Sequence, residues 1–427
     1  MPPSFVSHNE PVRAVDPASE RVWRVASAIF CSMMLCIHIM AGLNSGGLVD
    51  FWRDTYWASS IAQGQHFPLS GPAIYELFEL GPWWFYLLAV PVWLTRRIAS
   101  AAVLIQVLAA AKYFLARYIG TRWVDARFGF AFAVGMGVAG WSTVPMMFPS
   151  HPAVVETTIL LLVLASSRCW VNFSVGNALL FSLAAAACIH AHPTAATYPM
   201  VAGLTLLYRH RSWKAFVFIC LAVGIVLLSL LPPWLDFAPV PEGMARPLTK
   251  YADHDLGIEP WSRVLPLIRA LFIDGAWSGL LLRTPLSQGS AQVALAIYCL
   301  CLALALSGVF LLRSNRGKLR RWWLAALLMM TFQSIFLVAI RAKTTMWMIP
   351  SALPPVALLI AIGWYGWLGA GSSCCAQQAG SGWRSISCLP WRRSRFSWAR
   401  STRCARWRTS IRTPISASGT IPTPRYR

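Results

Sequence analysis

Charged residues are scarce in this chain. Only 12% of its 427 residues are Asp, Glu, Lys or Arg, against about 25% in a typical soluble domain. Hydrophobic residues make up 57%, and they form continuous runs of about 20 residues rather than an alternating pattern. This composition excludes an ordinary soluble domain and argues against a transmembrane barrel. It predicts an all-α polytopic membrane protein.

The cysteines and the N-terminal region exclude further classes. None of the 11 cysteines forms a CxxC pair with zinc-ligand spacing, and no disulfide framework is indicated. The first apolar run begins near Val25 and lacks a small-residue cleavage site, so we expect no cleaved signal peptide. No internal repeat of the kind found in transporters built from inverted halves is present.

The apolar runs predict ten spans and two large external loops. We expect a cytoplasmic lead at 1–23, a transmembrane domain at 24–370, and external loops at 44–97 and 236–290. The run at 81–94 is short and contains Pro91, so we interpret it as an interfacial or re-entrant helix. A short tilted span is the alternative. The predicted spans are 24–43, 98–117, 128–148, 153–168, 175–191, 194–208, 215–235, 291–312, 322–340 and 347–368.

Basic residues predict the orientation of these spans. If the N-terminus is cytoplasmic, the inner loops carry most of the Lys and Arg residues, as the positive-inside rule requires. The short outer connections are poorer in Lys and Arg, with Arg341 and Lys343 as an exception. The inner groups are Arg117, Arg122, Arg127, Arg168, Arg209, Arg211, Lys214, Arg313, Arg316, Lys318, Arg320 and Arg321.

Residues 371–427 form a tail of different character. It contains 11 arginines and no Lys, Asp or Glu, and without these arginines the net charge of +22 falls to +11. Two interpretations stay open: a disordered basic cytoplasmic tail, or translation out of the native reading frame from about Gly371. Neither indicates a nucleic-acid partner.

Carboxylates in the first external loop are the leading candidates for chemistry. Asp50 and Asp54 follow the first predicted span within about 10 residues. Carboxylates at a bilayer face are costly to desolvate and usually have a function there, such as general base or charge stabiliser. The structural alternative is that they pair with Arg53 or cap a helix.

An ordered set of motifs continues along this loop: 53–58 (RDTYWA), 62–64 (AQG), Pro68, 71–72 (GP) and 81–88 (GPWWFYLL). It resembles the first external loop of GT-C glycosyltransferases, integral-membrane enzymes related to protein O-mannosyltransferases and to the lipid A aminoarabinose transferase. That loop has an acidic residue, then a Tyr, an A-x-G-x-x-x-P run, and a Pro before an aromatic-rich segment. The resemblance covers residues 24–210 and rests only on hydropathy beyond them.

The resemblance implies roles for individual residues. Asp54 matches the catalytic Asp of the family, which activates the acceptor while a polyprenyl phosphate leaves the sugar, and Tyr56 is expected to contact substrate. Thr55 stands where many members have Glu, which leaves two alternatives: no second loop carboxylate is needed, or Asp50 supplies it. Glu79 resembles the Glu of a Phe-Glu-x-Pro stretch, with one residue's difference in register, and would line the site or meet a divalent metal.

Two further candidates lie at the outer ends of later spans. Glu156 stands near the start of a span, where the family often has an acidic residue; the alternative is a carboxylate stabilised by the helix dipole alone. His192 belongs to a sequence that resembles a His-Pro-Thr element of the family, and it would face the donor phosphate or the acceptor. Capping of the backbone is the alternative. His190 and His192 do not share a helix face, so no two-His metal site is indicated.

In the second loop, Arg246 and Lys250 are candidates to hold the phosphate of a lipid carrier, because fixed Arg and Lys side chains bind phosphate strongly. A solvated loop face is the alternative. The run 253–255 (DHD) has metal-capable side chains but matches no strong metal signature. Participation of a divalent metal therefore stays open.

Together these features predict a glycosyltransferase that moves a sugar from a polyprenyl-phosphate donor to a lipid, glycan or protein acceptor. We expect it to be a multi-pass protein of the bacterial inner membrane, surrounded by membrane lipids, with its site facing the periplasm. The alternatives are a non-catalytic carrier of lipid-linked glycans and an inactive remnant of the enzyme.

Overall fold

The structure is a computed structural model that describes residues 17–44, 49–74, 78–139, 149–235, 316–339 and 349–380, with single positions at 303, 307 and 310. The chain divides into two units, 1–377 and 378–427. The described elements lie in the first unit except for the end of the last helix. The predicted loop at 236–290 and residues 381–427 of the predicted tail lie outside the described residues.

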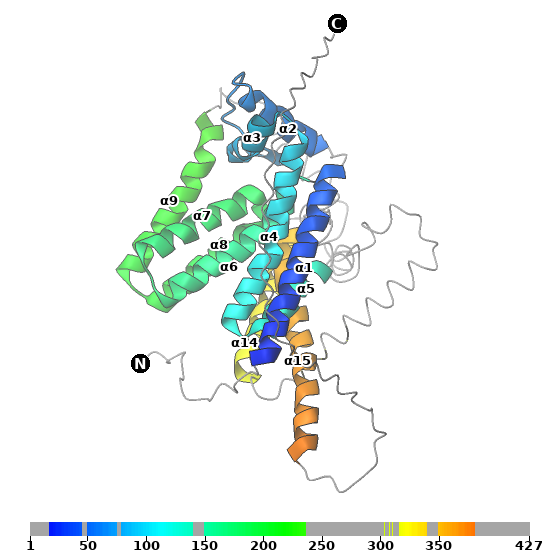
Figure 1. The fold of residues 1–427 in the computed structure, drawn as a ribbon. Coiled ribbons are helices and arrows are strands. Elements are labelled where there is room, and N and C mark those ends of the chain that lie inside the picture. The colour runs from blue at the N-terminus through cyan, green and yellow to red at the C-terminus, as the bar shows by residue number, and fades with distance from the viewer. Residues whose placement is uncertain are drawn as a thin grey trace, which may run out of the picture. The chain divides into compact units, whose positions relative to one another are not determined.

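Eleven α-helices form the described part of the chain, with one small hairpin (Figure 1). The helices are α1 Pro17–Asn44, α2 Val49–Ala62, α3 Trp83–Thr95, α4 Ala99–Trp123, α5 Ala126–Val138, α6 Val155–Val171, α7 Val175–Ala191, α8 Thr197–His210, α9 Trp213–Leu235, α14 Arg316–Ala339 and α15 Leu353–Gly380. Three 3-10 turns are η2 His151–Val154, η3 Pro193–Ala196 and η6 Ile349–Ala352. The antiparallel strands are β1 Ala73–Ile74 and β2 Phe78–Glu79, with Ala73 opposite Glu79.

Five helical segments in the described residues are long and apolar enough to cross a membrane, so the chain is a multi-pass membrane protein. They are Ala18–Asn44, Ala99–Trp123, His151–Val171, Trp213–Pro232 and Pro350–Leu368. The expected spans at 128–148, 175–191 and 322–340 correspond to shorter apolar helices. The expected span at 194–208 corresponds to η3 and α8, and that at 291–312 lies outside the described residues apart from three positions. The all-α class is therefore confirmed, whereas a total of ten spans is not shown.

Glycine permits the close packing of α4 against α5. A Cβ on Gly129 would lie 2.1 Å from Thr121 Oγ1 and 2.7 Å from the Arg117 carbonyl oxygen, so only a residue without a side chain fits there. The Asp125 carboxylate caps α5 by accepting a 2.9 Å hydrogen bond from Phe128 N. It also accepts a 2.8 Å bond from the Tyr365 hydroxyl, which ties α15 to the same turn.

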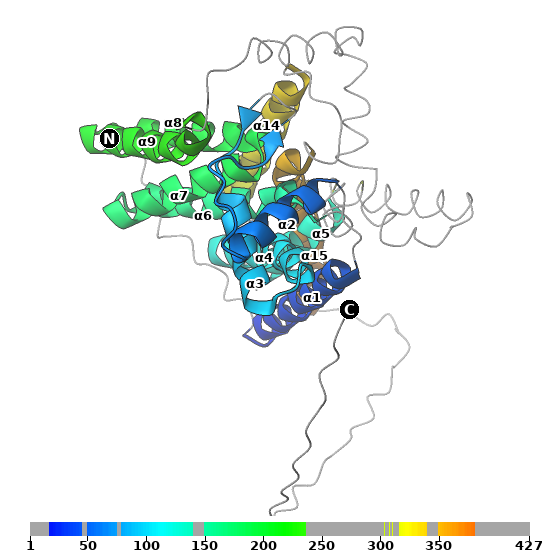
Figure 2. The ribbon, with the colours of Figure 1, turned by 90° about the horizontal axis from the view of Figure 1, so that it is seen from above.

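Arg24 and Arg117 lie together at the ends of α1 and α4 that are away from the first loop. Arg117, near the end of α4, donates to the Arg24 carbonyl near the start of α1 at 3.4 Å. His210 Nε2 lies 2.9 Å from the Cys169 carbonyl oxygen, so α6 and α8 end beside each other. These contacts fix α1 and α4 as an antiparallel pair whose opposite end carries the first loop (Figures 1 and 2).

The first loop folds into two helices with a turn and a hairpin between them. Helix α2 ends at Ala62, and Gly64 then takes the left-handed conformation (φ 70°) that terminates helices without steric cost. Pro82 precedes α3, whose 13 residues contain Pro91, and α3 packs on α2 and α4. The motif AQG of the sequence therefore encodes the end of a helix.

Helix α3 is fastened to α9 through a carbonyl that proline leaves free. Pro233 has no N–H group, so the Ser229 carbonyl four residues earlier has no donor within α9. Trp83 Nε1 supplies that donor at 2.7 Å. Gly81 completes the contact, since a Cβ there would lie 2.3 Å from the same Ser229 oxygen.

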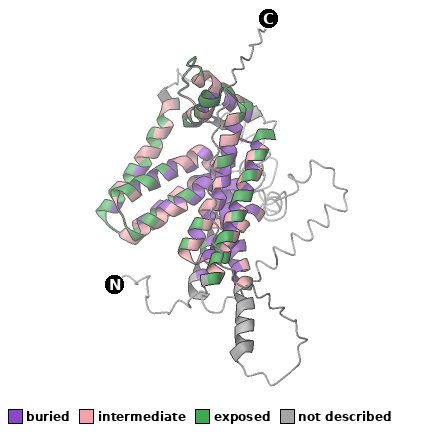
Figure 3. Ribbon diagram, viewed as in Figure 1, coloured by how far each residue is buried: buried purple, intermediate pink, exposed green. Residues whose placement is uncertain are grey.

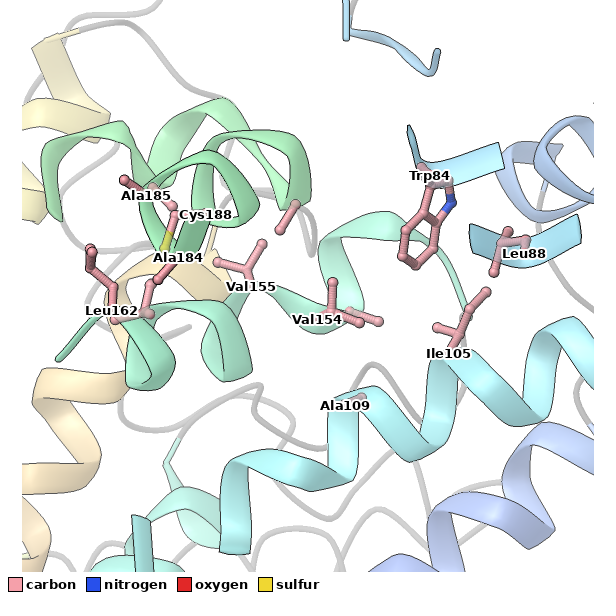
Figure 4. Close-up of a cluster of buried hydrophobic side chains, with 14 of the residues drawn as sticks. Trp84, Leu88, Ile105, Ala109, Val154, Val155, Leu162, Ala184, Ala185 and Cys188 are labelled. Atoms are coloured by element: carbon pink, nitrogen blue, oxygen red, sulfur yellow. The ribbon is translucent and has the colours of Figure 1, made fainter. Parts of the chain in front are cut away.

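A buried apolar cluster supports the first loop from below (Figure 4). Trp84 and Leu88 of α3 face Ile105 of α4 and Val154 of η2 in this cluster. Alanines elsewhere in the cluster, such as Ala109, let the helix backbones approach closely. Small residues favour helix association in a membrane, where the hydrophobic effect does not drive helices together. Burial is highest along α15 and lowest along α9 among the five candidate spans (Figure 3).

Candidate functional site

Helical periodicity puts Asp54 on the buried face of α2. Phe51, Asp54, Thr55 and Ala58 are all buried and recur at the three- and four-residue spacing of one helix face. The Asp54 side chain has 0% exposure. Its burial is unusual for a carboxylate and requires compensating partners.

Three hydrogen bonds hold the Asp54 carboxylate. Arg53 Nε and Nη2 donate to Oδ1 at 2.9 and 2.7 Å, and Trp84 Nε1 donates to Oδ2 at 2.8 Å. Hydrogen bonds to charged groups are roughly twice as strong as neutral ones, so these contacts offset the desolvation of the carboxylate. The Arg53 guanidinium also lies 3.2 Å from Asp50 Oδ1 and so bridges both loop carboxylates.

His151 approaches the remaining side of Asp54. Its Nδ1 lies 3.8 Å from Asp54 Oδ2, and this nitrogen is buried with no hydrogen-bond partner in the described residues. Pro152 follows it at the start of η2, which favours a new helical turn at this point. The indole of Trp84 stands edge-on to the imidazole, with ring centroids 6.4 Å apart.

His192 lies against the other face of His151. The two rings are nearly parallel, at an interplanar angle of 11° and a centroid distance of 6.3 Å. His192 Nδ1 accepts a 3.3 Å bond from Thr194 N and so caps η3. Burial, with a smaller contribution from His151, lowers the pKa of His192 from 6.5 to about 3, so its imidazole stays neutral.

A buried amide anchors the segment that carries His192. Gln333 of α14 donates from Nε2 to the Thr194 carbonyl at 2.8 Å and to Ser351 Oγ at 2.9 Å. Its Oε1 accepts a bond from the Thr197 hydroxyl. Helix α14 and turn η6 therefore hold η3 in place beside the two histidines.

Glu156 is placed away from any open surface. Its Oε2 lies 2.6 Å from Lys112 Nζ, and both side chains have 0% exposure. The pair joins the start of α6 to the middle of α4, five residues along the chain from His151. The ion pair therefore fixes the start of α6, and the adjoining turn η2, against α4.

The other predicted site residues are not brought to Asp54. Tyr56 is exposed on the opposite face of α2, and Glu79 is exposed in β2. Arg246 and Lys250 lie outside the described residues. Within the described part of the chain, no group of three or more His, Cys, Asp or Glu residues is arranged to hold a metal ion, so we assign no metal ligands.

Sequence reasoning did not single out His151 or the bond from Trp84. Residue 151 is nearly 100 positions from Asp54 in the chain, so no local spacing links them. The available signal was a histidine followed by proline at the edge of an apolar run. Trp84 lies in the aromatic-rich segment 81–88, and no spacing in the sequence marked it as a partner of Asp54.

Fold and site together define a multi-pass helical membrane protein with a buried carboxylate and two imidazoles at one end. No protein-family model matches the chain, and no curated protein matches it. Among solved structures, it is similar to ArnT from Cupriavidus metallidurans in the apo state, at 13% identity over 85% of this chain and 80% of that chain, with a TM-score of 0.37.

The chain is also similar to the archaeal oligosaccharyltransferase AglB from Archaeoglobus fulgidus, in complex with an inhibitory peptide and a dolichol-phosphate. The identity is 12% over 86% of this chain and the TM-score is 0.40. This match spans 53% of the AglB chain. Both are likenesses of structure at low sequence identity, and neither assigns a residue or an activity.

Proposed function

We propose that this chain is a membrane glycosyltransferase that uses a polyprenyl-phosphate sugar and transfers the sugar to a lipid, glycan or protein acceptor. The observation that carries the proposal is the fully buried Asp54, held by Arg53 and Trp84 in the loop that resembles the catalytic loop of GT-C enzymes. A buried, fixed carboxylate at the end of a helical bundle suits a reaction at the membrane surface.

The position of the site suits a lipid-borne donor. Asp54 lies in α2, beyond the end of α1, and Trp84 lies in the first turn of α3, the helix that precedes α4. A polyprenyl chain stays in the bilayer while its phosphate and sugar reach this level. Arg246 and Lys250 remain our candidates for holding the leaving phosphate.

The charge distribution supports an outward-facing site in the bacterial inner membrane. Arg24 and Arg117 lie together at the end of α1 and α4 that is opposite the first loop. Basic residues mark the cytoplasmic ends of spans. On that rule the Asp54 end faces the periplasm.

A non-catalytic carrier of lipid-linked glycans is the second candidate. Ionisable residues inside spans are typical of transport pathways, and the described spans contain the Lys112–Glu156 pair and His38, whose Nδ1 lies 2.7 Å from Gln106 Oε1. All of these side chains are fully buried, however, so they do not line an open path. The enzyme is therefore the better supported function.

Asp54→Asn tests the proposal in membranes supplied with undecaprenyl-phosphate mannose and undecaprenyl-phosphate aminoarabinose. We expect transfer of labelled sugar to fall by at least about a hundredfold, because the amide lacks the charge that the site is built around. The matched control is Asp125→Asn at the opposite end, since Asn caps helices as well as Asp does. Normal sugar transfer by correctly inserted Asp54→Asn protein would refute a role for Asp54 in the reaction. Transport of a lipid-linked glycan without any sugar transfer would favour the non-catalytic carrier.

A further inference from the structure

The Asp54 carboxylate has little room left for a substrate. An ionised carboxylate offers about four lone-pair positions. Arg53 occupies both positions on Oδ1, and Trp84 occupies one on Oδ2. The fourth faces His151 Nδ1, which lies 3.8 Å from Oδ2. Asp54 has 0% exposure and its remaining position is covered by His151, whose own side chain is 5% exposed, so an acceptor hydroxyl reaches His151 before it reaches Asp54.

We propose that His151, not Asp54, accepts the proton of the acceptor group, and that Asp54 orients His151 through its Nδ1. The inference rests on the proposed function and assigns the base within it. An unpartnered Nδ1 in a buried ring is costly unless a partner forms during the reaction. A shift of about 1 Å brings Nδ1 within hydrogen-bond reach of Oδ2, and catalytic hydrogen bonds are often long before substrate binds.

The groups around the two stacked imidazoles favour a proton on His151 over a proton on His192. The groups that face it are the Asp54 anion, the neutral edge of Trp84 and the parallel ring of His192. Among the described residues no carboxylate pairs with His192, and its Nδ1 already accepts from Thr194 N. Arg53 lies on the far oxygen of Asp54 and weakens the field of the carboxylate without cancelling it. A proton on the stacked pair is therefore stabilised on His151.

The reaction balances with this assignment. The acceptor oxygen or nitrogen forms a bond to the anomeric carbon of the sugar while the bond from that carbon to the phosphate oxygen breaks. The electron pair leaves with the polyprenyl phosphate, which gains one negative charge. The acceptor proton moves to His151 Nε2, since Nδ1 is the ring nitrogen that faces Asp54. The resulting imidazolium is paired with the Asp54 carboxylate, as in a buried Asp–His couple.

Two substitutions of His151 separate a base from a structural group. Asn places an amide nitrogen near the position of Nδ1 and retains a donor toward Asp54, but it has no proton acceptor at the position of Nε2. We expect His151→Asn and His151→Gln in the full-length protein both to lower kcat/KM roughly a hundredfold or more. His66→Gln is the matched control, since His66 is exposed on the loop.

The pH profile of kcat/KM with undecaprenyl-phosphate mannose and aminoarabinose decides which residue is the base. A base must be unprotonated, so the wild-type rate rises with pH through the apparent pKa of the base. We expect the rising limb of the pH profile to vanish in His151→Asn. In Asp54→Asn it should move to lower pH, because the anion that stabilises the imidazolium is gone.

Three outcomes overturn the assignment. A limb that survives in His151→Asn and disappears in Asp54→Asn makes Asp54 the base. Full activity of His151→Asn gives His151 a structural role alone. If the wild-type protein transfers no sugar from either donor, the proposed function fails first and the base assignment fails with it.

Discussion

Replacing Lys112 by Met tests what fixes the start of α6 against α4. Lys112 Nζ lies 2.6 Å from Glu156 Oε2, with both side chains fully buried. Met keeps an unbranched apolar stem but removes the ammonium group. Glu156 then remains in the interior without the cation that neutralises it.

The expected cost follows from opposing terms. At 2.6 Å and an effective dielectric constant of about 20, the attraction is about 6 kcal/mol. Desolvation of each ion costs several kcal/mol, so the intact pair contributes little net stability. Loss of one partner is different, because it leaves the other charge buried, and such changes cost about 3–5 kcal/mol. The double variant Lys112→Met with Glu156→Leu removes both charges and is expected to recover most of that loss.

Unfolding of the full-length protein by SDS in mixed micelles measures these differences. Lys214→Met is the matched control, since Lys214 is exposed near the start of α9 and surface changes are usually within about 0.5 kcal/mol. A single variant that loses less than about 1 kcal/mol, or a double variant less stable than the single one, would contradict the reasoning from a buried ion pair.

Two other predictions concern packing and pH. Gly129→Ala should destabilise the protein by about 1–3 kcal/mol in the same assay, because its Cβ meets the Arg117 carbonyl. Gly176→Ala is the control and should have little effect, since the space around Gly176 is open. Equal effects of the two substitutions would refute the close approach of α4 and α5. His192 has a folded-state pKa of about 3, below its unfolded value of 6.5, so the unfolded chain binds more protons between these values. Stability should therefore fall as pH drops through this window, by up to about 1.4 kcal/mol per pH unit. His192→Asn, which retains an acceptor for Thr194 N, should flatten that slope, and an unchanged slope would show that other groups cause it.

The sequence predicted the helical class and much of the organisation of the first loop. Continuous apolar runs mark α1, α4, α6, α9 and α15, because each must cross lipid with its backbone bonds satisfied internally. The run at 81–94 was too short for a span, and the structure has a helix of 13 residues there, Trp83–Thr95. Asp54 stood out because a carboxylate in that setting is costly.

The rest of the site depends on contacts that sequence spacing does not encode. His151 and Asp54 meet because α6 and η2 pack on α4 beneath the first loop, and no local pattern states that packing. Lys112 is one residue in an alanine-rich run and gave no sign that Glu156 would be its partner. The roles expected of the candidate site residues all stay predictions: Asp54, Asp50, Tyr56, Glu79, Glu156, His192, Arg246 and Lys250.

The adjacent residues Trp83 and Trp84 donate hydrogen bonds to two parts of the chain that are far apart in sequence. Trp83 holds the Ser229 carbonyl of α9, and Trp84 holds the Asp54 carboxylate. Pro232 and Pro233 favour a bend in α9 where that carbonyl lies, so a change in the bend would act on the Trp83 bond and, through the adjoining residue, on Trp84. The carboxylate that we propose for the reaction is thus tied through one dipeptide to the last turns of α9, next to the segment expected to form the second external loop.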